Sequence, residues 1–128
     1  MSTALTFRTL RFASPLPGLE DAEGFSLREI AGAEGLFALE ALEPKVRMFV
    51  ADASVYVPAY APVLPAFAVE AVGLASPADG NVLVVVNPSA DKTTVNLMAP
   101  ILLNPSNGVC LQVILDGGKY PLRAELAK

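Results

Sequence analysis

The stretch that decides the fold runs from Val95 to Arg123 and reads VNLMAPILLNPSNGVCLQVILDGGKYPLR. Successive positions from Val109 to Leu115 alternate between two faces, with only valine and leucine on one of them, which is the period of a β-strand. Another short apolar run, Pro100 to Leu103, precedes this segment. The sequence NPSNG between the two runs has the composition of a tight turn. The stretch therefore predicts two strands joined as a hairpin.

This hairpin also holds polar residues and a proline that a plain hairpin does not need. Asn96 and Asn104 flank the apolar run from Leu97 to Leu103. Because buried amides must find hydrogen-bond partners, we expect each to hold local backbone in preference to touching a partner. Pro100 removes a backbone donor, so its strand is expected to be an edge, a bulge or a strand start. An edge strand would offer a docking place for another chain.

The rest of the chain consists of short apolar runs separated by Gly and Pro. Further strands are expected at Leu5 to Phe12, Phe25 to Ile30, Leu36 to Leu42, Lys45 to Ala51, Asn81 to Asn87 and Thr93 to Met98. The prolines between Ala53 and Pro65 predict an extended, irregular path, and Pro65 can open a short helix to about Gly73. Seven to nine strands without a βαβ rhythm predict a mainly β fold: a small antiparallel, partly open β-barrel or sandwich with one short helix.

Length and composition restrict the class of protein. The 128 residues are expected to form a single domain, 1–128. One cysteine excludes an internal disulfide, and the absence of histidine removes the usual zinc spacings and the Ser-His-Asp triad. Cys110, in the middle of a strand, is expected to be an inert packing residue. No catalytic, cofactor-binding or metal-ligating residue is predicted, and no cofactor.

The apolar segments do not predict a membrane protein. The uncharged stretch from Ala53 to Val69 contains three prolines that would break a spanning helix. Arg8 and Arg11 interrupt the apolar N-terminal segment, so a signal peptide is not expected. The sequence predicts a cytoplasmic protein.

The net charge of −4 is unevenly distributed. The segment from Glu20 to Glu43 contains seven acidic residues and one basic residue, a net charge of −6. The remainder of the chain carries +2. Such a segment would repel a phosphate backbone and attract a basic protein, so direct binding of nucleic acid is disfavoured. A solvated surface explains the same charges. Glu20, Asp21 and Glu23 could also supply a ligand site, although their spacing does not fit a calcium loop.

Aromatic residues supply the remaining candidates for partner binding. Tyr56 and Tyr60 lie in a proline-constrained loop, where they either provide contact area or cover the core beneath. Tyr120 follows Gly117-Gly118 and belongs either to a closing turn or to a docking surface. The candidate partner-binding residues are thus Tyr56, Tyr60, Asn96, Pro100, Asn104 and Tyr120.

The order of motifs is more specific than any one of them. In the C-terminal half these motifs are Asn96-Leu97, Ala99-Pro100-Ile101, Asn104, Gln112 to Leu115 and Tyr120 to Arg123. In this order they resemble the flagellar assembly factor FliW family. Phe12, the stretch from Pro15 to Asp21 and Phe25 resemble the N-terminal signature of that family. The sequence departs from the family at Leu19, where phenylalanine is usual, and in the apolar loop from Ala61 to Ala68, where relatives are commonly acidic.

The resemblance covers Leu5 to Leu126 and implies a compact β-barrel-like fold with a regulatory, non-enzymatic role. Proteins of this family bind newly made flagellin, and after its export they bind the RNA-binding translational repressor CsrA and relieve repression of flagellin synthesis. The acidic segment fits a basic partner of that kind. Two alternatives stay open: a small β-barrel enzyme or ligand-binding domain using the carboxylates at Glu20 to Glu23, and a structural subunit of an assembly.

Overall fold

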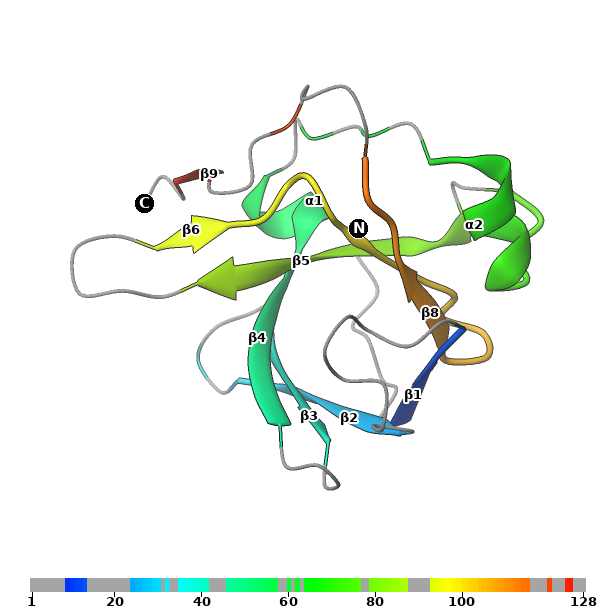
Figure 1. Cartoon of the computed structure of the whole chain (residues 1–128). Coiled ribbons are helices and arrows are strands. Elements are labelled where there is room, and N and C mark those ends of the chain that lie inside the picture. The colour runs from blue at the N-terminus through cyan, green and yellow to red at the C-terminus, as the bar shows by residue number, and fades with distance from the viewer. Residues whose placement is uncertain are drawn as a thin grey trace.

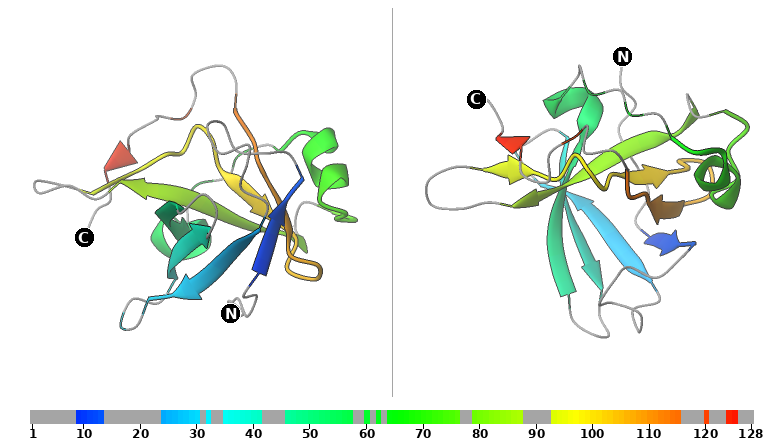
Figure 2. Two further views of the ribbon diagram at one scale, coloured as in Figure 1. Left: turned by 60° about the horizontal axis from the view of Figure 1, so that its bottom comes forward. Right: turned by 45° about the horizontal axis from the view of Figure 1, so that its top comes forward.

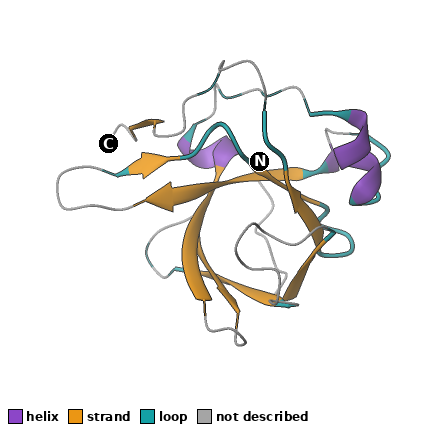
Figure 3. Ribbon diagram, in the orientation of Figure 1, coloured by secondary structure: helices purple, strands orange, loops and turns teal. Residues whose placement is uncertain are grey.

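The computed structural model of the chain describes residues 9–13, 24–30, 32, 35–41, 46–57, 60, 62, 64–76, 79–87, 93–115, 120 and 124–125. These residues form nine strands and two short helices (Figure 1, Figure 3). The strands are β1 (Thr9–Phe12), β2 (Phe25–Glu29), β3 (Leu36–Ala41), β4 (Val46–Asp52), β5 (Asn81–Asn87), β6 (Thr94–Val95), β7 (Ile101–Leu103), β8 (Val109–Gln112) and β9 (Ala124–Glu125). The helices are α1 (Ala53–Tyr56) and α2 (Ala66–Ala71).

Seven of these strands close a barrel. They pair in the order β4-β3-β2-β1-β8-β7-β5, and β5 pairs again with β4. All of these pairings are antiparallel except that of β1 with β8, which is parallel. The predicted mainly β barrel is therefore confirmed, and it is closed where the sequence left it partly open.

Strand β5 makes the closure possible because of its length. One edge pairs with β4, while the other pairs with β7 near the start of the strand and with β6 near its end. β6 in turn pairs with β9, so this pair of short strands extends beyond the barrel (Figure 1). The sequence of β5, NVLVVVN, is apolar on both faces. The prediction of a central strand at Asn81 to Asn87 is confirmed.

The barrel interior holds the main hydrophobic core, to which all seven barrel strands contribute. Its buried members are Leu10, Phe25, Leu27, Phe37, Leu39, Ala41, Val50, Leu83, Ile101, Leu103 and Cys110. They recur at alternate positions along β1 and β2, as expected for strands that bury one face. Full burial of one such side chain stabilises the fold by roughly 1.5–3 kcal/mol.

Two outer clusters bury the other face of part of the barrel. Ala68, Val69 and Val72 of α2 and its C-cap pack on Leu102 and Leu111. The second cluster packs the region around α1 and β6 on Ala51, Val84 and Val86. Strands β5, β7 and β8 are consequently covered on both sides. The end of β4, expected to be half-exposed, is covered too, because Ala51 is fully buried.

The helices differ in how well the sequence predicts them. Pro65 is the N-cap of α2, so the short helix is confirmed with its first turn one residue later than expected. The extended path expected from Ala53 is wrong over its first four residues, which form α1. Asp52 caps this helix by accepting from the backbone N–H of Ser54 at 2.9 Å and from its hydroxyl at 2.7 Å. Neither helix is long enough and apolar enough to cross a membrane, and the described residues hold no other.

Candidate functional site

Tyr60 brings together residues that lie far apart in the sequence. Its hydroxyl donates a hydrogen bond to the carbonyl oxygen of Leu97. Its ring packs edge-on against that of Tyr120, with centroids 4.9 Å apart and an angle of 88° between the planes. Burial raises the pKa of Tyr60 to about 12, with a smaller contribution from Tyr120. The phenol is therefore a neutral donor at ordinary pH.

Tyr56 and Asn96 lie around this tyrosine pair. Tyr56, at the end of α1, is half-buried and packs with Tyr60 and Leu97 against the same outer cluster. The side-chain oxygen of Asn96 accepts from the backbone N–H groups of Met98 at 2.9 Å and Ala99 at 3.1 Å, which shapes the turn after β6. The expectation that Asn96 holds local backbone is confirmed. We call Tyr56, Tyr60, Asn96 and Tyr120 the tyrosine surface.

Pro100 and Asn104 lie elsewhere and are buried. Pro100 directly precedes β7 and is fully buried, so the strand-start alternative is confirmed. β7 is not an edge, because it pairs with β5 on one side and β8 on the other. The edge alternative, and with it a docking edge at this strand, is therefore excluded. The sequence around β7 does not reveal its pairing with β5, because β5 lies in a distant segment of the chain.

Asn104 links the β7–β8 turn to α2. Its side-chain nitrogen donates to the carbonyl oxygen of Val72, the C-cap of α2, at 2.8 Å. Its side-chain oxygen accepts from the backbone N–H of Ser106 at 2.8 Å. With only 4% of its surface exposed, Asn104 holds backbone as expected and offers little surface to a partner.

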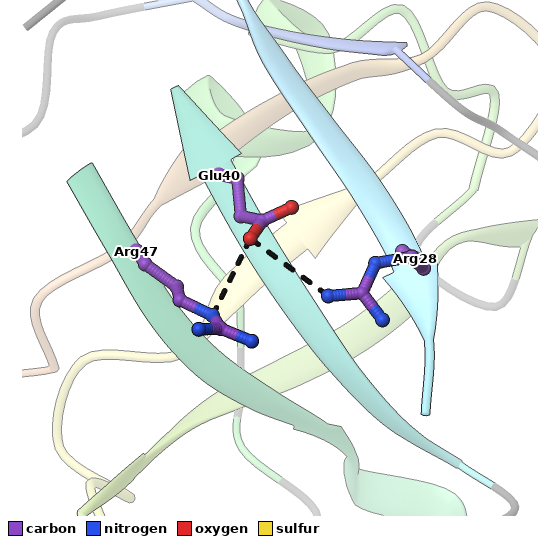
Figure 4. Close-up of polar contacts among 3 residues, drawn as sticks. All are labelled: Arg28, Glu40 and Arg47. Atoms are coloured by element: carbon purple, nitrogen blue, oxygen red, sulfur yellow. Dashed lines mark ion pairs between the residues drawn. The ribbon is translucent and has the colours of Figure 1, made fainter. Parts of the chain in front are cut away.

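The acidic segment is partnered where the structure describes it. Glu40 on β3 lies between Arg28 on β2 and Arg47 on β4 (Figure 4). Glu29 accepts from the backbone N–H of Gly35 at 3.2 Å. Sequence reasoning missed the group of Arg28, Glu40 and Arg47, since only the strand register brings these residues together. The proposed ligand site at Glu20, Asp21 and Glu23 lies outside the described residues.

Cys110 has no features of a reactive thiol. It is fully buried in the barrel core. Burial raises the pKa of the thiol to about 12, against a smaller lowering by Arg11. The packing role expected for Cys110 is confirmed. Among the described residues no three His, Cys, Asp or Glu side chains gather as a metal site would need.

The apolar loop from Ala61 to Ala68 is buried at some positions and exposed at others. Leu64 packs against the α2 cluster, and Ala68 is fully buried. Phe67, by contrast, has 65% of its surface exposed. Part of this loop therefore completes the fold, while one aromatic ring faces solvent.

Comparison with known proteins agrees with this architecture. The sequence model of the family described as "FliW protein" matches residues 4–126. "Flagellar assembly factor FliW" of Moorella thermoacetica is 34% identical over 123 residues, which cover 93% of this chain and 78% of the relative. The protein of the same description from Campylobacter lari is 32% identical over 115 residues, covering 88% of this chain and 86% of the relative.

A solved structure has the same fold. It is described as "Crystal structure of the flagellar assembly factor FliW" and superposes with a TM-score of 0.82 at 24% sequence identity, over 92% of this chain and 84% of that chain. The family match spans nearly the whole sequence, including the hairpin from which the fold was inferred. The chain belongs to the FliW family of flagellar assembly factors.

Proposed function

We propose that this chain is a non-enzymatic regulator of flagellum assembly that acts in the cytoplasm by exchanging two protein partners. It binds flagellin, and when flagellin has been exported it binds a CsrA-like translational repressor and relieves repression of flagellin synthesis. The observation that carries this proposal is the match of residues 4–126 to the FliW family. The fold supports a binding role, because the barrel interior is filled by apolar side chains.

The tyrosine surface is the proposed contact area for a partner. Its members come from α1, the following loop, the turn after β6 and a position near the end of the chain. Tyr60 and Tyr120 fix each other's rings, so little side-chain entropy remains to be lost on association. Aromatic rings held in this way are typical of residues that dominate binding energy. Pro100 and Asn104 are buried, so they would support binding indirectly, by holding the β7–β8 hairpin in place.

Charge supports the choice of a basic second partner. The chain carries a net charge of −4, and the segment from Glu20 to Glu43 alone carries −6. An acidic protein attracts a basic RNA-binding repressor, and its negative charge also disfavours the binding of RNA to the resulting complex.

The test is calorimetric titration of the purified protein with flagellin and with the CsrA-like repressor of the same host, separately and in competition. Each partner is expected to bind, and flagellin is expected to displace the repressor. Tyr60→Ala and Asn96→Ala are compared with Ser106→Ala, a change of an exposed residue away from the tyrosine surface. Lost binding by a variant that is still folded at the temperature of the titration identifies a contact residue. Failure of both partners to bind the wild-type protein would refute the proposal.

A further inference from the structure

The outer face of β2, β3 and β4 carries two arginines around a single carboxylate. Strand register places Arg47 opposite Glu40, and it places Arg28 two residues along β2 from Ser26, the residue that pairs with Glu40. The distances to the same carboxylate oxygen, Oε2 of Glu40, are 3.3 Å from Nε of Arg47 and 3.8 Å from Nη2 of Arg28. Figure 4 shows both guanidinium groups directed toward this oxygen. We call Arg28, Glu40, Arg47 and Phe49 the arginine face.

These ion pairs are loose. Both separations are longer than the about 2.9 Å of a charge-assisted hydrogen bond. The arginine side chains are 55% and 59% exposed, for Arg28 and Arg47 respectively. Exposed pairs of this kind add little to stability. Each guanidinium has five N–H donors, so most of them remain available to a second acceptor.

Phe49 provides an apolar contact next to this charge. The guanidinium carbon of Arg47 lies 5.6 Å from the centroid of the Phe49 ring, and the ring is half-buried. Stacking on an aromatic ring restricts the side chain of Arg47, which lowers the entropy that it loses on binding. The arginine face thus combines an excess of one positive charge with an aromatic surface.

Of the three strands that carry the arginine face, β2 and β3 are not covered by a helix on their outer side, while β4 is contacted by α1. α2 packs on the outer side of β7 and β8, and α1 contacts β4 and β5. The outer side of β2 and β3 lies away from both helices (Figure 2). Phe49, on β4, packs on the outer cluster that also holds Tyr56 and Tyr60, so the arginine face borders the tyrosine surface at β4.

We propose that the arginine face docks an acidic segment of a partner protein. A carboxylate of that segment binds the guanidinium donors that Glu40 leaves unused, and an adjacent apolar side chain packs on Phe49. A positive face on a chain of net charge −4 complements a local carboxylate, while the chain as a whole repels an extended polyanion such as RNA. This inference does not rest on the flagellar partners proposed above.

The test uses a fluorescent peptide of alternating Glu and Leu as the probe and a peptide with Gln in place of Glu as its control. Anisotropy is measured with Arg28→Gln, Arg47→Gln and Glu40→Gln. Arg11→Gln is the matched control, because it removes one positive charge from another exposed strand position. The two changes in the arginine face are expected to weaken binding about two- to fivefold each. Glu40→Gln is expected to strengthen it by a similar factor, because it removes the competing internal carboxylate.

Docking is distinguished from a structural role if peptide affinity falls in the two Arg variants and rises in the Glu40 variant. Weaker binding by all three variants, together with lower melting temperatures, would indicate that the group only supports the sheet and would overturn the proposal. An equal loss with Arg11→Gln would indicate diffuse charge attraction and also overturn it. The same holds if an RNA oligonucleotide binds with the same dependence on Arg28 and Arg47, or if the Gln peptide binds as tightly as the Glu peptide.

Discussion

Tyr60 shows how one side chain can serve both the fold and a binding surface. Its hydroxyl fixes the turn at Leu97, and its ring holds Tyr120. Part of the same ring packs on the outer cluster beside β4 and β5. The two interpretations left open by the sequence, contact area and core cover, are therefore compatible. Substitutions must separate the hydroxyl from the ring.

Tyr60→Phe removes the hydroxyl and keeps the ring. We expect the free energy of unfolding to fall by about 1 kcal/mol, since a hydrogen bond is lost and the ring contact with Tyr120 remains. Urea denaturation followed by circular dichroism measures this change. Tyr60→Ala, which also removes the ring, is expected to cost clearly more. Equal losses for the two variants would show that the hydroxyl carries the whole effect.

The raised pKa of Tyr60 makes stability depend on pH in the alkaline range. The folded value is about 12 and the unfolded value is 10.0. Between these values the unfolded chain has released the proton and the folded chain has kept it, so the free energy of unfolding falls as pH rises from 10 toward 12. Denaturation curves at several alkaline pH values should show a steeper fall for the wild type than for Tyr60→Phe. Parallel curves for the two proteins would contradict this assignment.

At the scale of elements, helix α2 is held on the barrel by more than apolar contact. The carbonyl oxygen of Val72, at its C-cap, accepts hydrogen bonds from the side chains of Asn104 at 2.8 Å and Asn107 at 3.3 Å. Both amides come from the β7–β8 turn. The hairpin that first indicated the fold therefore also fixes the end of the helix.

Asn104→Ala is expected to lower the free energy of unfolding by about 1–3 kcal/mol, because it leaves buried backbone groups without their partner. Asn107→Ala is the matched control. Asn107 makes similar hydrogen bonds from an exposed position, where water can replace the lost amide. Chemical denaturation of both variants measures the difference. An effect of Asn107→Ala as large as that of Asn104→Ala would mean that burial is not the cause.

Sequence reasoning found elements whose pattern is local and missed those that depend on a distant partner. β5 has its predicted bounds because five successive apolar residues stand between two asparagines. α1 has too few residues to show a helical period, and only the cap at Asp52 marks it. β9 consists of two residues that are defined by pairing with β6. The group of Arg28, Glu40 and Arg47 was missed for the same reason, since register is not visible in one strand alone.

On the scale of the whole molecule, β5 is the strand on which most pairings converge. It pairs with β4, β6 and β7, and both of its faces are covered. β9, in contrast, makes one short pairing at the rim. Local opening is least favourable where buried contacts are most numerous.

Hydrogen exchange followed by mass spectrometry should therefore show the slowest exchange for the amides of β5, from Leu83 to Val86. The amides of β9 should exchange fastest among the strands, because opening there breaks few contacts. Exchange of β5 at the rate of β9 would contradict the account of barrel closure through the β4–β5 pair.

The parallel pairing of β1 with β8 has a consequence for the timing of synthesis. Arg11 and Cys110 lie 99 positions apart, yet they meet at this seam. Translation proceeds at about 5–20 residues per second, so β1 waits on the order of 5–20 s for the strand that completes its pairing. During this interval Leu10 and Phe12 cannot complete their burial in the barrel core, and exposed apolar side chains beside an unpaired strand edge favour aggregation. The barrel can close only after its eighth strand has been synthesised.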